Sequence, residues 1–208
     1  GRPVQPAEVD AQPIAPAYDA ACVTALVPAL LHGDLVPGGW PSWLPGEVLG
    51  SRRILLLVLD GLGWEQLRSR SAAAPNLAAL AGGPITTVAP STTASALTSI
   101  STGVAPGLHG VVGYRIAVGA PEEAPHAEVL NALRWTTGDG DARRRHDPRE
   151  FQPCELFEAQ WPLVVTREAF ASSGFTAAHL SDTRLMGYRD RDGLVSRVLE
   201  AFDGGEPF

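Results

Sequence analysis

One continuous apolar run that ends at an acidic residue constrains the fold of this chain most. Residues 53–59 (RILLLVL) carry no polar side chain after Arg53, and the run stops abruptly at Asp60-Gly61. A strand that is apolar on both faces is typical of the centre of a parallel sheet that helices cover on both sides. The run is much shorter than the ~20 residues that a transmembrane helix needs. It therefore predicts a central strand of an α/β domain.

Helix-like and strand-like patterns alternate along the rest of the chain. The sequence predicts a helix over 18–31, helical stretches over 64–81 interrupted at Pro75, a short strand at 85–88, a helix over 92–101, a hairpin formed by 114–119 and 127–136, short strands at 164–165 and 175–178, and a last helix over 192–202 capped by Asp192. This alternation indicates an α/β fold. The residues after 202 resemble the start of another strand, so we expect a chain truncated at its C-terminus.

Two regions of the chain differ in composition. Residues 1–50 combine a proline-rich arm, a helix and a loop that contains Trp40 and Trp43, and we expect this region to pack on the core. Residues 51–208 carry the alternating pattern and form the main domain. Within it, the arginine-rich segment 137–150 is expected to be a solvated surface loop.

Charge and composition exclude several classes of function. The chain has 208 residues, a net charge of -7 and no lysine. Binding to a nucleic-acid polymer depends on neutralising phosphates, and a P-loop needs a lysine, so both are disfavoured. The two cysteines, Cys22 and Cys154, have no metal-binding spacing and are expected to be buried free thiols. No secretory signal or membrane span is visible, so we expect a cytoplasmic protein without a membrane partner.

Asp60 is the first candidate site residue. Ligands of open α/β sheets bind beyond the carboxyl ends of the strands, where a carboxylate can hold a cation. The alternative is that Asp60 caps the helix that follows, as Asp residues at such turns often do. The glycines Gly61 and Gly63 are only a weak dinucleotide signal, because Gln66 stands where a third glycine belongs.

Three successive hydroxyl residues, Ser91, Thr92 and Thr93, form a second candidate site. They open a predicted helix, whose free N–H groups and positive dipole favour a phosphate or an alkoxide. Simple helix capping explains them equally well, and a threonine is a weak nucleophile unless a base or a metal activates it. His109 is a third candidate: it could ligate a metal, contact phosphate or fix its glycine-rich loop by hydrogen bonds, and we favour the last role.

Taken together, three segments resemble one known family. LLLVLDGLG (55–63), ITTVAPSTTASALTSISTG (85–103) and APGLHGVVGY (105–114) are similar to motifs of the type I phosphodiesterase/nucleotide pyrophosphatase family of the alkaline phosphatase superfamily. The family's spacing puts Thr93 at the nucleophile position, with Gly103 ten residues later and His109 six residues after that glycine. The resemblance implies an alkaline-phosphatase-like three-layer sandwich with a mostly parallel central sheet.

The resemblance also implies a reaction and its cofactors. It implies metal-dependent hydrolysis of phosphodiester or pyrophosphate bonds with two divalent cations, usually zinc. Asp60 and Thr93 would ligate a cation, and Thr93 would attack phosphorus to form a phosphothreonine intermediate. Tyr114 stands where nucleotide diesterases of the family often have an Asn that contacts a phosphate oxygen. The expected partner is a small phosphorylated substrate, with a nucleotide as one candidate; nothing indicates the oligomeric state.

The chain departs from the family pattern in its later part. The family's other metal ligands come from an Asp-x-x-x-His segment, an Asp-His-Gly and a final His, and none of these is present. We expect them beyond the C-terminus, and we expect this chain alone to be inactive. Two alternatives stay open: a non-catalytic phosphate- or nucleotide-binding relative, and a phosphomutase or phosphonate hydrolase of the same superfamily.

Overall fold

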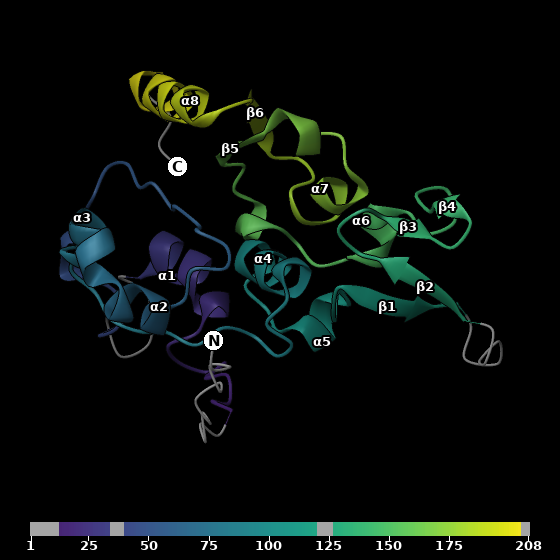
Figure 1. Cartoon of the computed structure of the whole chain (residues 1–208), viewed down its shortest axis with the longest axis horizontal. Coiled ribbons are helices and arrows are strands. Elements are labelled where there is room, and N and C mark those ends of the chain that lie inside the picture. Colours follow the sequence, from purple (N-terminus) through teal and green to yellow (C-terminus); the bar gives the residue numbers. More distant parts are fainter. Residues whose placement is uncertain (1–12, 34–39, 120–126, 205–208) are drawn as a thin grey trace, which may run out of the picture.

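The structure is a computed structural model that describes residues 13–33, 40–119 and 127–204. It is a mixed α/β structure, as Figure 1 shows. Short helices from the first 80 residues gather at one side of the molecule. A small antiparallel sheet lies at the other side, and α4 (Thr93–Thr102) lies between them.

The antiparallel sheet has four strands in the order β1 (Arg115–Val118), β2 (Glu128–Asn131), β3 (Thr136–Thr137) and β4 (Gly140–Asp141). Ile116 pairs with Leu130, and both side chains are buried in the core, whereas the neighbouring Val129 is exposed. Alternation of this kind is typical of a sheet with one solvated face. The predicted hairpin is confirmed.

A parallel pair of strands forms the second sheet. β5 (Leu163–Arg167) runs beside β6 (Arg184–Tyr188), and α7 (Gly174–His179) connects them. α8 (Arg191–Asp203) follows and packs on both strands. The strand predicted at 164–165 is confirmed. The strand predicted at 175–178 is wrong, because these residues form α7, which begins where the Ser173 side chain accepts the Thr176 N–H.

α4 is buried although it is rich in hydroxyl residues. Its hydroxyls bond to carbonyls of the preceding turn, for example Thr98 Oγ1 to Ala94 O at 2.8 Å and Thr102 Oγ1 to Thr98 O at 2.7 Å. A buried hydroxyl without a partner would be destabilising, and these internal bonds remove that cost. The helix ends at Gly103, whose φ of 73° is left-handed. The helix predicted over 92–101 is confirmed.

The other helices are short. They are α1 (Leu26–His32), α2 (Trp64–Ser69), α3 (Pro75–Ala78), α5 (Pro106–His109) and α6 (Pro148–Phe151), with 3₁₀ turns at Val23–Ala25, Gly46–Val48, Ser71–Ala73, Phe157–Ala159 and Glu168–Phe170. Prolines begin α3, α5 and α6, where a missing N–H costs nothing.

The predicted cap of α8 was wrong by two residues: Asp190, not Asp192, accepts the N–H of Gly193.

Trp135 is the largest fully buried side chain among the described residues. Its ring meets Phe151 edge-on at 5.5 Å between centroids, and its Nε1 donates to His146 O at 2.7 Å.

The expectation of buried thiols is right for Cys22, which is fully buried, but wrong for Cys154, which is half-buried; both are free.

The predicted central strand does not form within the described residues. Residues 54–59 are extended but belong to neither sheet, and the exposed fraction of Leu57 is 59%. A strand needs a hydrogen-bonded neighbour, and none lies beside this segment in the part of the chain that the structure describes. The predicted strand at 85–88 is likewise reduced to one parallel bridge between Thr86 and Cys22. A mostly parallel central sheet is therefore not formed by these residues.

Several predictions concern residues outside the described ranges. They are most of the proline-rich arm (1–12), part of the tryptophan-containing loop (34–39), the hairpin tip (120–126) and most of the expected further strand (205–208). Within the described ranges, no helix has the length and apolar character needed to cross a membrane.

Candidate functional site

Asp60 is placed by a tight turn at the end of the apolar segment. The N–H of Leu62 donates to Leu59 O at 3.2 Å, which closes a turn with Asp60 and Gly61 at its two central positions. Gly61 has a φ of 77°, as a type II turn requires at its third residue, and glycine adopts this conformation without strain. The Asp60 side chain is therefore held at an exposed corner.

Thr93 is placed by the start of α4. It is the first helical residue, and Thr92 is the N-cap. The first hydrogen bond within the helix runs from Ala96 N to Thr92 O at 2.9 Å, so the N–H groups of residues 93–95 precede it. Such groups, together with the helix dipole, attract negative charge to the space in front of the helix.

The turn and the helix bring Asp60 and Thr93 together. The Thr93 hydroxyl donates to Oδ2 of Asp60, with 2.8 Å between the two oxygens, although 33 residues separate them in the sequence. Two oxygens at this distance lie within the span of a single cation with metal–oxygen bonds of ~2.0–2.2 Å. The hydroxyl cluster therefore divides: Thr93 faces Asp60, whereas the Thr92 hydroxyl lies 3.2 Å from that of Ser95.

His109 is fully buried and is not open to a ligand. The Val111 N–H donates to its Nδ1 at 3.1 Å, so the proton of the neutral ring is on Nε2, which lies 2.9 Å from the Ser99 hydroxyl. Burial lowers the pKa of His109 to about 4. Of the three roles considered for His109, the geometry supports the loop-fixing role.

Tyr114 lies between α5 and β1 and makes no hydrogen bond to Asp60 or Thr93. Its hydroxyl accepts from Nδ2 of Asn131 at 2.8 Å, and its side chain is 41% exposed. Because the Tyr114 oxygen acts as the acceptor in this pair, its own proton is free to donate to a ligand. The register that pairs Arg115 with Asn131 creates this contact.

The chain was compared with models of protein families. The family described as type I phosphodiesterase / nucleotide pyrophosphatase matches residues 54–178, which is more than half of the chain. The chain belongs to this family. No curated protein and no solved structure matched it in two further comparisons. The matched range begins at the apolar segment before Asp60 and includes Thr93 and Tyr114.

The donor set of the described residues does not make a complete metal centre. Asp60 supplies a carboxylate and Thr93 a hydroxyl, which suit a hard or borderline cation by their chemistry. No group of three His, Cys, Asp or Glu side chains that could hold a metal occurs within the described ranges. Two cations need more ligands than these two residues provide. The contact fits part of one metal site, and the described residues do not fit the whole two-metal centre.

Two contacts that support the candidate site have no signal in the sequence. Ser99 lies in the middle of α4, and its hydroxyl contacts His109. Asn131 lies on β2 and holds the Tyr114 hydroxyl. An isolated Ser or Asn is uninformative by itself. The helical register of α4 and the pairing register of the hairpin bring these residues into place.

Proposed function

We propose that this chain is part of a metal-dependent hydrolase of phosphodiester or pyrophosphate bonds, with Thr93 as the nucleophile. The contact between the Thr93 hydroxyl and the Asp60 carboxylate, at the N-terminus of α4, carries the proposal. Residues 51–208 would form the N-terminal part of an alkaline-phosphatase-like catalytic domain, and residues 1–50 would pack against it. In this proposal the domain has a mostly parallel central sheet.

In this mechanism Asp60 orients the nucleophile. The hydrogen bond directs the Thr93 proton towards Oδ2 and leaves lone pairs of Oγ1 free to face a phosphorus atom. Asp60 and Thr93 are the described residues that would hold a cation, and the remaining ligands would come from outside the described residues. Bound divalent metal, zinc in most of the family, would supply positive charge that lowers the pKa of the hydroxyl and of water.

The substrate phosphoryl group would lie in front of α4. The bond from Thr93 Oγ1 to phosphorus forms as the bond from phosphorus to the leaving oxygen breaks, and the hydroxyl proton leaves Thr93 on the Asp60 side. Water then cleaves the phosphothreonine and restores the hydroxyl. The N–H groups at the start of α4 and the free proton of Tyr114 would bind the non-bridging oxygens, whose negative charge grows in the transition state.

The nucleophile assignment is tested in the complete gene product with a p-nitrophenyl phosphodiester as substrate. Thr93→Ala should lower kcat/KM by at least ~10³-fold because the attacking oxygen is removed. Thr92→Ala is the matched control, since it removes the adjacent hydroxyl, and it should stay within about threefold of the parent. Equal activity of Thr93→Ala and the parent would exclude Thr93 as the nucleophile.

A second candidate function is a non-catalytic module that binds a phosphate or a nucleotide. The donor set around Asp60, which is incomplete within the described residues, supports it. Zinc titration of the complete gene product separates the two candidates, since a two-metal enzyme takes up about two ions per chain. Uptake of one ion or none, with no turnover of any phosphoester, would favour the binding module. Products from a panel of mono- and diesters would separate a hydrolase from a phosphomutase or phosphonate hydrolase.

The proposal includes a small phosphorylated substrate, with a nucleotide among the candidates, and no nucleic-acid polymer. An acidic chain without lysine supports this part of it. A cytoplasmic location is also part of the proposal, and the free state of Cys22 and Cys154 is consistent with it. Fractionation of cells that express the complete gene product would test the location.

A further inference from the structure

Residues 17–23, which we call the N-terminal strap, lie beside the segment that leads into α4. The two meet at the isolated parallel bridge between Cys22 and Thr86. The Thr86 N–H donates to Ala21 O at 2.8 Å, and the Val23 N–H donates to Thr86 O at 3.0 Å. The strap is therefore bonded to the chain just upstream of α4.

The side chain of Thr86 adds two hydrogen bonds to this bridge. Its hydroxyl accepts the Ala17 N–H at 2.8 Å and donates to Ala21 O at 3.0 Å. A threonine hydroxyl has one proton to donate and lone pairs to accept, so one side chain fills both roles. Thr86 thus holds the strap at Ala17 as well as at Ala21.

Tyr18 holds the same segment nearer to α4. The Ala20 N–H donates to Ala17 O at 2.9 Å, which closes a turn with Tyr18 at one of its two central positions. From this turn the Tyr18 hydroxyl accepts the Ala89 N–H at 3.1 Å. Three residues lie between Ala89 and Thr93. The strap therefore fixes the backbone almost at the first residue of α4.

The strap is the hydrogen-bonding support of the segment that leads into α4. Within the described ranges, the backbone groups of residues 85–91 form hydrogen bonds only with strap residues. Ala89 and Pro90 are exposed. Exposed connecting segments are generally more mobile than the elements that they join. The bonds to the strap limit this mobility where the chain enters the helix.

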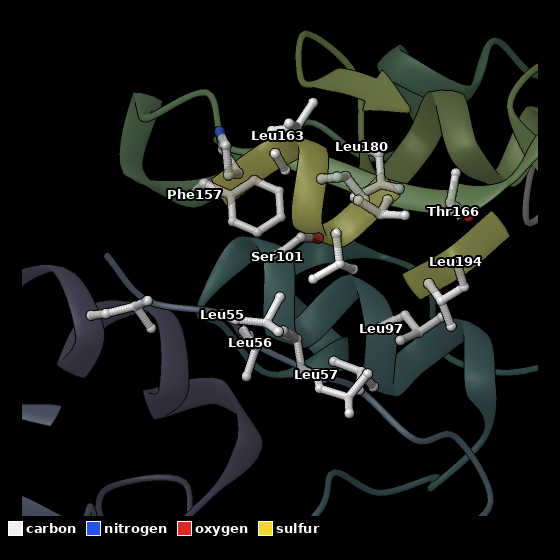
Figure 2. Close-up of a pocket in the computed structure, with 18 of the residues that line it drawn as sticks. Leu55, Leu56, Leu57, Leu97, Ser101, Phe157, Leu163, Thr166, Leu180 and Leu194 are labelled. Carbon is white, nitrogen blue, oxygen red and sulfur yellow. The ribbon is translucent and has the colours of Figure 1, made fainter. Parts of the chain in front are cut away.

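The residues after the strap pack along α4. Val27 of α1 and Ile100 of α4 belong to one apolar cluster, and Pro28 lies beside the C-terminal end of α4. On another side α4 borders an apolar groove of about 430 Å³, where Figure 2 shows Leu97 and Ser101. An open groove does not oppose a shift of the helix. Contacts on its other sides, including those with the N-terminal residues, therefore hold α4 in place.

We propose that the N-terminal strap positions Thr93 for attack on phosphorus, with Tyr18 and Thr86 as its two positioning residues. This inference rests on the proposed function, in which Thr93 is the nucleophile. Asp60 holds the Thr93 hydroxyl, and the strap holds the backbone that carries it. In-line attack needs the reacting atoms ~3–3.5 Å apart and aligned, so a small displacement of the backbone slows the step.

The alternative is that the strap contributes only to stability. The two roles predict different kinetics for the folded enzyme. A displaced nucleophile lowers kcat and kcat/KM equally, because the substrate still binds but the transition state is stabilised less. A purely structural strap leaves both parameters of the folded enzyme unchanged.

Conservative variants of the complete gene product separate these roles, with a p-nitrophenyl phosphodiester as substrate. Tyr18→Phe removes the acceptor of the Ala89 N–H, and Thr86→Val removes the Thr86 hydroxyl. Each should lower kcat about 10-fold with KM within about twofold of the parent. Thr86→Ser keeps the hydroxyl and should restore kcat to within about twofold of the parent. Thr183→Val is the matched control: it removes a hydroxyl that donates to Leu180 O at 2.8 Å, outside the strap, and should leave kcat and KM unchanged.

Hydrogen exchange measured by mass spectrometry gives a readout that does not depend on turnover. The amides of residues 85–89 should exchange at least ~10-fold faster in Tyr18→Phe and in Thr86→Val than in the parent. Thr183→Val should match the parent. A double variant tests the route through the nucleophile: Tyr18→Phe should not slow the residual turnover of Thr93→Ala any further, because both changes act at the same atom.

Three results would overturn the proposal. The first is unchanged exchange of residues 85–89 in both strap variants. The second is faster exchange with an unchanged kcat, which would leave the strap a structural role only. The third is a loss of kcat in Thr86→Ser as large as in Thr86→Val. Full activity of Thr93→Ala would instead reject the proposed function, and the two failures are distinguishable because exchange is measured without turnover.

Discussion

Nε2 of His109 lies 2.9 Å from the hydroxyl of Ser99, and both side chains are fully buried. This bond connects α4, which begins at Thr93, with the glycine-rich loop that leads to Tyr114. The Val111 N–H completes the arrangement by donating to Nδ1. The candidate site residues Thr93 and Tyr114 thus lie on two elements that are joined by a neutral, buried histidine.

This arrangement predicts a loss of stability in mild acid. Burial lowers the pKa of folded His109 to about 4 from 6.5, so between these values only the unfolded chain takes up the proton. The contribution of neutral His109 to the free energy of unfolding is complete above pH 6.5 and is lost as the pH falls towards 4. From pH 7 to pH 4.5, the free energy of unfolding should fall by about 2 kcal/mol more in the parent than in His109→Gln.

Urea unfolding at the two pH values measures this difference. Other groups with shifted pKa values, such as His179 and Glu128, are common to both chains and cancel in the comparison. An identical pH dependence of the parent and His109→Gln would contradict a buried neutral His109.

The negative charge of Asp60 can be tested separately from its hydrogen bond. In Asp60→Asn, the remaining carbonyl oxygen can still accept the Thr93 hydroxyl, but the carboxylate charge that would hold a cation under the proposed function is lost. We expect kcat/KM of the complete gene product for a phosphodiester to fall at least ~10²-fold, with less than about 0.5 kcal/mol change in the free energy of unfolding. Glu65→Gln, at an exposed acid on α2, is the matched control and should leave both unchanged.

The local elements were predictable because their signals lie within each segment. The hydroxyl-rich helix that ends at Gly103 and the hairpin around Ile116 and Leu130 follow from capping and alternation. The pairing of distant segments was not predictable in this way. An apolar run such as 54–59 indicates a buried strand, but its partner is specified elsewhere, and in the described residues no partner is present.

A short apolar run also caused the wrong prediction of a strand at 175–178. Residues 175–178 suit a strand and a buried helix equally by their pattern, and the Ser173 cap decides for α7. The motif spacing selected Thr93 and Asp60, and the structure brings their oxygens to 2.8 Å, whereas the Asn131 contact with Tyr114 had no signal in the sequence.

The free hydroxyl proton of Tyr114 predicts a role in binding the substrate. Tyr114→Phe removes that proton but keeps the ring, and the exposed Asn131 amide can bond to water instead. We expect kcat/KM for a phosphodiester to fall by about 10- to 100-fold, as for the loss of one hydrogen bond to a charged group. Asn131→Ala should have a smaller effect, since it only releases the ring. No change in Tyr114→Phe would exclude a contact between Tyr114 and the phosphate.

The antiparallel sheet offers a matched pair of positions for a test of the core. Leu130 is fully buried, whereas the adjacent Val129 is 49% exposed on the other face of β2. Leu130→Ala leaves a cavity and should lower the free energy of unfolding by about 2–5 kcal/mol. Val129→Ala should cost less than about 1 kcal/mol. Equal effects in urea unfolding would contradict the register that pairs Ile116 with Leu130.

The C-terminal end of α4 provides a last test, based on backbone conformation. Gly103 has a φ of 73°, and a Cβ added there would lie 3.1 Å from Cγ of Pro28. Gly103→Ala should therefore cost about 1–2 kcal/mol, because a left-handed residue with a side chain is strained. Gly107→Ala in α5 is the control, since a Cβ there would meet nothing within 4 Å; it should be neutral or stabilise by up to ~1 kcal/mol. Urea midpoints that fall equally in both variants would show that the Gly103 conformation is not the cause.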